Sequence, residues 1–184
     1  MEHLGNPGHS SGHAPDLIWL RKMIVERALT RGDYVLSGGV RSDYYIDKFR
    51  LFADPQVLRR IARLFTPLLA ETNPDLIGGT ELGGVVIATA VSQMTGIPMI
   101  AVRKQPKGYG AFADEFVEGP YEQGQHVLLL EDVVTTGREL LGSAARLEEL
   151  GLKVTPCAVV SRGLAPVRAL IQFSLPRGNA QMEN

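Results

Sequence analysis

Two runs of consecutive apolar residues, VLLL at positions 127–130 and CAVV at positions 157–160, constrain the fold of this chain most. A half-exposed strand alternates polar and apolar side chains, whereas a parallel strand covered by helices on both faces is apolar throughout. The residues between the two runs have the pattern of a helix at 137–150, and the same order occurs earlier, with predicted elements at 76–77, 82–94 and 97–102. The repeated β-α-β order predicts an α/β fold with an open parallel sheet flanked by helices.

The first third of the chain is predicted to add a helix, a small hairpin and a second helix. Pro15 and Asp16 open an amphipathic helix that should run to about residue 30. Short strands at 34–36 and 44–46, on either side of a Gly-Gly turn, predict an N-terminal hairpin or hood. Asp54 followed by proline predicts the N-cap of a helix that ends near residue 69.

Length and composition favour one domain. The 184 residues, 45% hydrophobic and 21% charged, suit one globular core, which we expect over residues 15–175. Residues 1–14 are rich in Gly, Ser and His without apolar periodicity, so they are expected to be a disordered leader, and residues 176–184 a flexible tail. Residues 103–124 are too long for an ordinary connection, which favours a mobile catalytic loop over simple disorder.

Charge and cysteine content exclude several classes of partner. The net charge of -1 provides no general positive field for nucleic acid or an anionic membrane. The sequence has neither an apolar stretch long enough to cross a membrane nor a secretory signal. The single cysteine, Cys157, suits a reducing compartment. We therefore expect a cytoplasmic protein that binds neither nucleic acid nor membrane.

The strongest functional pattern is VLLLEDVVTTG at positions 127–137. Glu131 and Asp132 end the buried strand, which is where open α/β sheets bind their ligands. Burying two carboxylates without partners would be costly, so they are expected to face a polar ligand or a cation, and the diol of a pentose is a good candidate.

The turn behind the acids favours a phosphate. Thr135, Thr136 and Gly137 precede a helix whose unpaired N–H groups and dipole attract anions. Arg138 supports this interpretation, because a cation in the first turn opposes the helix dipole unless an anion is bound nearby. The alternative is an ordinary N-cap with a solvated arginine.

A second cluster of charge begins the long loop. Arg103, Lys104 and Lys107 lie close together in the sequence VRKQPKGYG, at positions 102–110. Mobile cations next to glycines suit a departing diphosphate, which must be neutralised and then released. A solvated basic loop is the other interpretation. A lone GxGxxA match starting at Gly108 is not followed by a clear helix, so a dinucleotide fold is rejected.

The segment 127–137 resembles the phosphoribosyl-diphosphate-binding signature of the type I phosphoribosyltransferases: an apolar strand, two acids, two hydrophobic residues and a Thr-Thr-Gly loop. In that family the acids bind the ribose hydroxyls, directly or through magnesium, and the loop holds the 5-phosphate. The resemblance implies a Mg²⁺ cofactor held mainly through the substrate, near Asp132, without direct metal ligands from the protein. The residues that it assigns to phosphoribosyl-diphosphate binding are Arg103, Lys104, Lys107, Tyr109, Glu131, Asp132, Val133, Val134, Thr135, Thr136, Gly137, Arg138 and Glu139.

Further segments resemble the orotate phosphoribosyltransferases, in particular the short bacterial and archaeal enzymes. Residues 36–50 resemble their N-terminal hairpin, residues 78–85 their diphosphate-side loop and residues 102–110 their catalytic loop, with Tyr109 where many members have histidine. In that family the loop reaches into the neighbouring subunit's site, which implies a homodimer with shared active sites. The resemblance gives catalytic roles to Arg103, Lys104, Lys107 and Asp132.

The base side of the site rests on Arg162, which matches the arginine that pairs with the orotate carboxylate; Thr135 is also expected to contact orotate. Two departures concern this side. The family usually has Asp-Arg where this chain has Ser161-Arg162, and the helix expected next is reduced to a few residues before the segment 167–173.

The resemblance implies transfer of the phosphoribosyl group from phosphoribosyl diphosphate to orotate, which yields orotidine 5'-phosphate and diphosphate in pyrimidine biosynthesis. Two alternatives stay open. A phosphoribosyltransferase for another base would share the sugar and phosphate motifs. A non-catalytic regulator that senses phosphoribosyl diphosphate would keep the fold, although the cations at 103–107 and the lack of an added DNA-binding helix pair weigh against it.

Overall fold

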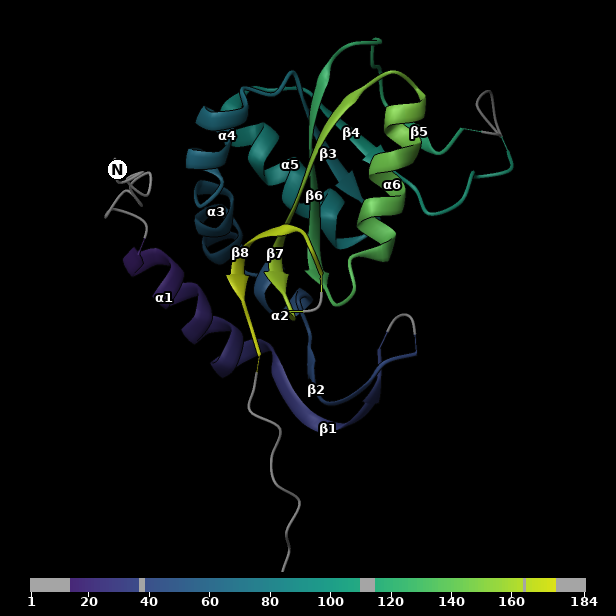
Figure 1. The fold of residues 1–184 in the computed structure, drawn as a ribbon. Coiled ribbons are helices and arrows are strands. Elements are labelled where there is room, and N and C mark those ends of the chain that lie inside the picture. Colours follow the sequence, from purple (N-terminus) through teal and green to yellow (C-terminus); the bar gives the residue numbers. More distant parts are fainter. Residues whose placement is uncertain (1–13, 37–38, 110–114, 164, 175–184) are drawn as a thin grey trace, which may run out of the picture.

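The structure is a computed structural model that describes residues 14–36, 39–109, 115–163 and 165–174 (Figure 1). The expected leader and tail lie outside the described residues, except Ala14, which begins the first helix. In chain order the elements are α1 (Ala14–Met23), the π-helix η1 (Ile24–Ala28), β1 (Leu29–Val35), β2 (Arg41–Ile46), α2 (Phe49–Phe52), α3 (Pro55–Arg63), α4 (Thr66–Thr72), β3 (Leu76–Thr80), α5 (Gly83–Thr95), β4 (Met99–Val102), β5 (Val117–Glu118), β6 (His126–Val134), α6 (Arg138–Glu149), β7 (Lys153–Ser161) and β8 (Arg168–Gln172).

Six strands form one sheet in the order β5-β4-β3-β6-β7-β8. Every neighbouring pair is parallel except β4 and β5, so the expected open parallel sheet is confirmed. The strand with the strongest apolar run, β6, lies inside the sheet between β3 and β7. Leu128, Leu129 and Leu130 are fully buried, and the burial of each such side chain contributes roughly 1.5–3 kcal/mol.

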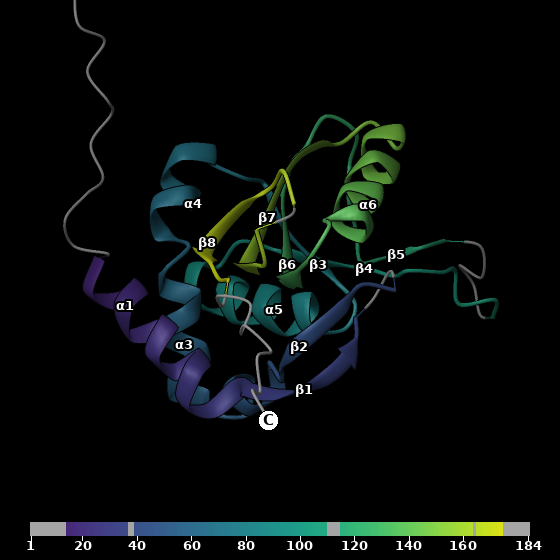
Figure 2. The same ribbon diagram turned by 60° about the horizontal axis from the view of Figure 1, so that its bottom comes forward.

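The side chains of β6 alternate between two apolar cores. Leu128 and Leu130 belong to the core that contains buried residues of α3 and α5, whereas Val127 and Leu129 belong to the core that contains Leu140 of α6. Figure 2 shows α5 and α6 on opposite faces of the sheet. Because α5 follows β3 and α6 follows β6, both helices begin at the carboxyl edge of the sheet.

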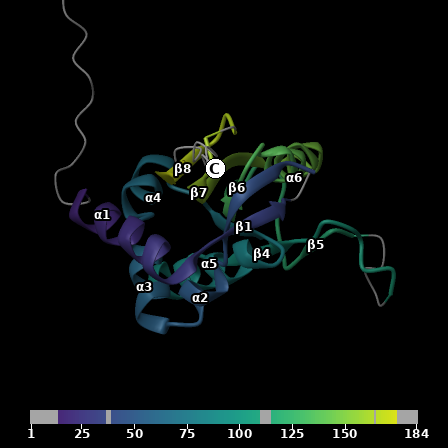
Figure 3. The same ribbon diagram turned by 90° about the horizontal axis from the view of Figure 1, so that it is seen from below.

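A two-stranded antiparallel hairpin, β1 with β2, lies beyond this carboxyl edge (Figure 1). Figure 3 views the molecule from that end, with β1 in front of β6. The hairpin is anchored by Tyr44, which is buried and donates a hydrogen bond from its hydroxyl to the Phe173 carbonyl at 3.4 Å. The expected hood is therefore present at the end of the sheet where ligands bind.

Two predicted helices in the N-terminal third have the wrong bounds. The helix expected to run to residue 30 ends earlier, because the chain passes through η1 and Leu29 already begins β1. The helix expected over 55–69 is divided into α3 and α4, since Pro67 has no N–H to continue the hydrogen bonding of α3. The Asp54 cap is confirmed, with its Oδ1 accepting from the N–H groups of Gln56 at 2.9 Å and Val57 at 3.4 Å.

The C-terminal end of the sheet differs from the usual parallel connection. Parallel neighbours normally need a crossover of about a dozen residues or more, whereas only residues 162–167 connect β7 to β8. The short β5 lies within the loop predicted over 103–124 and was not anticipated. None of the helices in the described ranges has the length and apolar character required to cross a membrane.

Candidate active site

A cavity of about 390 Å³ opens at the carboxyl edge of the sheet, under the hairpin. Seven residues singled out from the sequence line it: Lys104, Glu131, Asp132, Val133, Thr135, Glu139 and Arg162. The other lining residues come from the hairpin, the segment after it and the β3–α5 turn, and they are Val35, Leu36, Tyr45, Ile46, Lys48, Glu81 and Leu82. The fold thus brings the acidic pair, one loop lysine and the predicted orotate arginine to one space.

The acidic pair at the end of β6 is buried but hydrogen-bonded. Glu131 is 9% exposed and Asp132 is 4% exposed. The Glu131 carboxylate accepts from the Thr80 hydroxyl at 2.5 Å and from the Asp132 N–H at 3.0 Å. Burial, followed by the neighbouring charge of Asp132, raises the pKa of Glu131 to about 7. A cation or ligand hydroxyls at this position would therefore act on a carboxyl that is close to its titration point.

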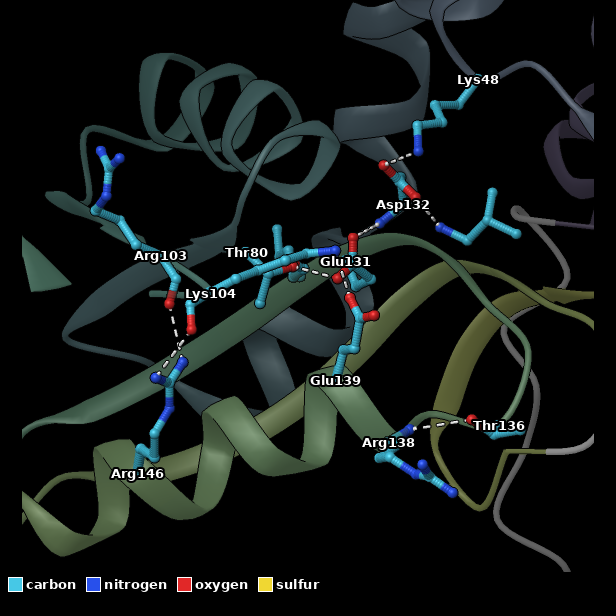
Figure 4. A network of polar contacts seen from close by, with 12 residues as sticks. Lys48, Thr80, Arg103, Lys104, Glu131, Asp132, Thr136, Arg138, Glu139 and Arg146 are labelled. Atoms are coloured by element: carbon cyan, nitrogen blue, oxygen red, sulfur yellow. Dashed lines mark hydrogen bonds and ion pairs between the residues drawn. The ribbon is translucent and has the colours of Figure 1, made fainter. Parts of the chain in front are cut away.

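Asp132 has a cationic partner that sequence reasoning did not identify. The Nζ atom of Lys48, which follows β2, lies 3.1 Å from Asp132 Oδ2 (Figure 4). This ion pair connects the hairpin segment to the end of β6, and it partly neutralises the buried carboxylate. The segment 36–50 pointed to this region, but nothing in the local pattern identified Lys48 itself.

Glycines allow the β3–α5 turn to approach the acids closely. A Cβ atom added at Gly83 would lie 1.7 Å from Asp132 Oδ2, and one at Gly84 would lie 2.3 Å from the Leu130 carbonyl oxygen. No side chain fits at either position without displacement of the neighbours. The GGTELGGV segment is therefore part of the wall of the site, as the resemblance implied.

The turn between β6 and α6 forms a second, smaller hollow of about 80 Å³ beside the first. It is lined by Glu131, Val133, Val134, Thr135, Thr136, Gly137, Arg138, Glu139 and Leu140. Gly137 occupies the N-cap position with a φ of 75°, and no side chain caps the helix there. The Arg138 N–H makes only a long hydrogen bond to Thr136 Oγ1, at 3.5 Å (Figure 4). The first turn of α6 thus begins at this hollow without a cap from residue 137, which is an arrangement that binds phosphate.

The basic loop has only one cation in the main cavity. Lys104 extends toward the acids and its Nζ lies 2.5 Å from Glu139 Oε2, whereas Arg103 points away from them (Figure 4). The hydrogen bond that Lys104 donates to the Glu139 carboxylate raises the pKa of Lys104, so this lysine stays charged.

The other two cations of the loop face Glu118 on β5. Arg103 Nη1 lies 3.7 Å and Lys107 Nζ lies 3.2 Å from its carboxylate. The Nε atom of Arg103 also lies 3.9 Å from Oε2 of Glu81, which lines the main cavity. Tyr109 is exposed and lines neither hollow. The structure therefore does not bring Arg103, Lys107 or Tyr109 to the acids of the same chain.

Arg162 is held by the hairpin. Its Nη2 donates to Ser42 Oγ at 2.5 Å, and its guanidinium carbon lies 3.8 Å from the centroid of the Tyr44 ring. This contact fixes the plane of the guanidinium at the cavity wall, where a planar carboxylate could pair with it. Ser161, which replaces the usual aspartate, is buried and its hydroxyl accepts from the Gly163 N–H at 3.2 Å.

Within the described residues, no group of three or more Asp, Glu, His or Cys side chains is arranged to hold a metal ion. Glu81 lines the cavity and the buried Thr80 donates to the Glu131 carboxylate, and neither was singled out individually from the sequence. Thr80 ends β3 and Glu81 follows it. Only the pairing of β3 with β6 places these two residues near the acidic pair.

The parallel sheet, the carboxylates at its edge and the uncapped helix behind them define a phosphoribosyltransferase site. A family model described as "Phosphoribosyl transferase domain" matches residues 50–169, more than half of the chain.

Similar proteins narrow this class. An orotate phosphoribosyltransferase of Thermococcus gammatolerans is 44% identical over 141 residues, covering 76% of this chain and 74% of the relative. One from Nocardioides sp. is 43% identical over 130 residues, covering 70% and 71% of the two chains. The crystal structure of Mycobacterium tuberculosis orotate phosphoribosyltransferase in complex with 5-phospho-alpha-D-ribosyl 1-diphosphate has a TM-score of 0.66 and 28% identity, over 84% of this chain and 93% of that one. The chain belongs to the orotate phosphoribosyltransferase family.

Proposed function

We propose that this protein transfers the phosphoribosyl group of phosphoribosyl diphosphate to orotate, with Mg²⁺ as cofactor, as a cytoplasmic homodimer. The observation that carries the proposal is the placement of a buried acidic pair and an uncapped helix N-terminus at adjoining hollows. A sugar phosphate offers hydroxyls at one end and a dianionic phosphate at the other, which are the two chemistries that these hollows accept.

The reaction requires no protein nucleophile. The bond between the anomeric carbon and the diphosphate oxygen breaks, and its electron pair leaves with the diphosphate. A ring nitrogen of orotate forms the new bond to that carbon, and the proton on the nitrogen is lost to the diphosphate or to water. Positive charge develops on the ribose as the bond breaks, so the buried carboxylates of Glu131 and Asp132 would stabilise it.

We assign the 5-phosphate to the hollow at Thr135, Thr136 and Gly137, where first-turn amides and the helix dipole favour an anion. Orotate would then lie on the hairpin side of the cavity, with its carboxylate on the Arg162 guanidinium. Holding both reactants in one cavity supplies much of the rate enhancement in reactions of this kind.

The leaving diphosphate requires cations, and Lys104 is the loop cation that lines the cavity. Arg103 and Lys107 are paired with Glu118, Arg103 also with Glu81, and neither side chain lines the cavity or pairs with Glu131 or Asp132 of the same chain. This separation supports a homodimer in which the loop of one subunit serves the site of the other.

The donor set suits magnesium brought by the substrate. Mg²⁺ in such sites keeps several waters and is held by one or two carboxylates together with substrate phosphates. The ion would lie near Asp132 and be held mainly through the substrate, and it would neutralise the charge of the diphosphate. The chain has a single cysteine, Cys157, so it forms no internal disulfide, which suits a reducing cytoplasm. Burial raises the pKa of this thiol to about 12, which keeps it protonated and inert.

A base-panel assay tests the proposal. Protein, phosphoribosyl diphosphate and Mg²⁺ are mixed with orotate, uracil, hypoxanthine or adenine, and nucleotide formation is followed. We expect turnover with orotate alone, its loss when the metal is chelated, and its recovery when Mg²⁺ is added back. Turnover with another base would identify a different phosphoribosyltransferase, and binding of phosphoribosyl diphosphate without any turnover would identify a sensor.

A further inference from the structure

Arg146, on the last turns of α6, lies beside the start of the basic loop. Its Nη2 donates to the Arg103 carbonyl at 2.9 Å and its Nη1 to the Lys104 carbonyl at 3.3 Å (Figure 4). Its guanidinium carbon lies 4.2 Å from the centroid of the Phe116 ring. The Phe116 carbonyl in turn accepts from the Arg103 N–H at 2.7 Å. The segments that begin and end the loop therefore both contact α6 through the Arg146 side chain.

The same helix also holds the side chain of Lys104. Glu139 and Arg146 are two turns apart in α6, so they lie on one face of the helix. Glu139 pairs with the Lys104 ammonium, and Arg146 binds the Lys104 carbonyl. The N-terminus of α6 is the turn assigned to the 5-phosphate, so one rigid element connects that turn to the main chain of Lys104.

We propose that Arg146 is a positioning residue for Lys104, an inference that rests on the function proposed above. By binding both carbonyls, Arg146 fixes the start of the loop relative to the phosphate turn. The Lys104 ammonium can then exchange Glu139 for the leaving diphosphate by side-chain rotation alone. Arg146 does not line either hollow, so its effect on the reaction passes through Lys104.

The planar guanidinium is suited to this task. Two parallel N–H groups reach two successive carbonyls, whereas a lysine ammonium offers a single point of charge. Arg146→Lys should therefore restore only part of the function lost in Arg146→Gln. Arg59, an exposed arginine on α3, provides the matched control as Arg59→Gln.

A double-mutant cycle tests the inference. We expect Arg146→Gln to lower kcat about tenfold while the KM for orotate changes less than about twofold. In the Lys104→Ala background the same change should lower kcat by less than about twofold, because the side chain that Arg146 positions is already absent. The affinity for phosphoribosyl diphosphate with Mg²⁺, measured by calorimetry on the same four proteins, should show the same non-additivity.

Equal effects of Arg146→Gln with and without the Lys104 side chain would overturn the inference and leave the proposed function intact. If the wild-type protein forms no nucleotide from orotate, the proposed function fails, and the affinity cycle then decides about Arg146 in the same way. If Arg146→Gln does not fold, the cycle is carried out with Arg146→Lys, for which additive effects would again contradict the inference.

Discussion

Among single residues, Glu131 shows the free-energy cost of burying one acidic side chain next to another. A buried carboxyl beside a second carboxylate resists ionisation, and its pKa of about 7 instead of 4.5 reflects that cost. Ligand hydroxyls or a cation at this point would relieve it. Ionisation of Glu131 is therefore expected to lower the stability of the protein at neutral and alkaline pH when substrate is not added.

The pH dependence of stability tests this view. The folded protein holds more protons on Glu131 than the unfolded chain between pH 4.5 and about 7, so the free energy of unfolding should fall as pH rises through this window. Glu131→Gln should remove that contribution, on the order of 3 kcal/mol at most. Urea denaturation of both proteins at pH 5 and pH 8 measures it.

The control for this comparison is Glu148→Gln, which removes a carboxylate from an exposed position on α6. We expect wild type to lose more stability than Glu131→Gln between the two pH values. Identical losses in wild type and Glu131→Gln would show that Glu131 is not buried as described.

The sequence indicated which residues lie together where the pattern is local. Glu131, Asp132, Thr135 and the glycine after them lie in one segment, and a strand followed by a helix fixes where such a segment must lie. Lys48 and Thr80 contact the acids only through tertiary packing. They are too far from the acids in the sequence for a local pattern to predict the contact. Arg103 and Lys107 were grouped with Lys104 by sequence proximity, but the pairing of both with Glu118 depends on β5.

At the scale of elements, the β3–α5 turn is the most constrained part of the wall. Gly83→Ala would place a methyl group at the Asp132 carboxylate, where the added atom has no space. We expect a loss of stability of about 1–3 kcal/mol and a fall in turnover, because Asp132 must move. Thermal denaturation and steady-state kinetics measure the two effects.

Gly142→Ala is the matched control, since an added Cβ on that face of α6 meets nothing within 4 Å. This change should raise stability by roughly 0.5–1 kcal/mol through helix propensity and leave turnover unaltered. Equal behaviour of the two variants would contradict the close approach of the turn to the acids.

The elements that sequence predicted well are those with strong periodicity and clear ends. The cores of β6, β7, α5 and α6 follow from apolar runs and helical spacing, and α3 follows from the Asp54 cap. The single-turn α2 and the two-residue β5 are too short to have a period. The segment 167–173 was left without an assignment, and most of it forms β8, a parallel neighbour that follows an unusually short connection.

At the scale of the whole molecule, the proposed sharing of sites between subunits predicts complementation. Lys107→Ala impairs the loop and Asp132→Asn impairs the acidic pair, so each homodimer should have low activity. A refolded equal mixture should recover about a quarter of wild-type activity, because half of the dimers are hybrids and each contains one intact site. Activity of the mixture that equals the mean of the two variants would indicate self-contained subunits.

The central claim is that one sugar phosphate is held by the acids at the end of β6 and by the turn that begins α6. A crystal structure with phosphoribosyl diphosphate and Mg²⁺ tests it most directly. We expect the ribose hydroxyls at Glu131 and Asp132, directly or through the ion, and the 5-phosphate on the amides after Thr135. A substrate bound elsewhere, with both hollows vacant, would contradict the account.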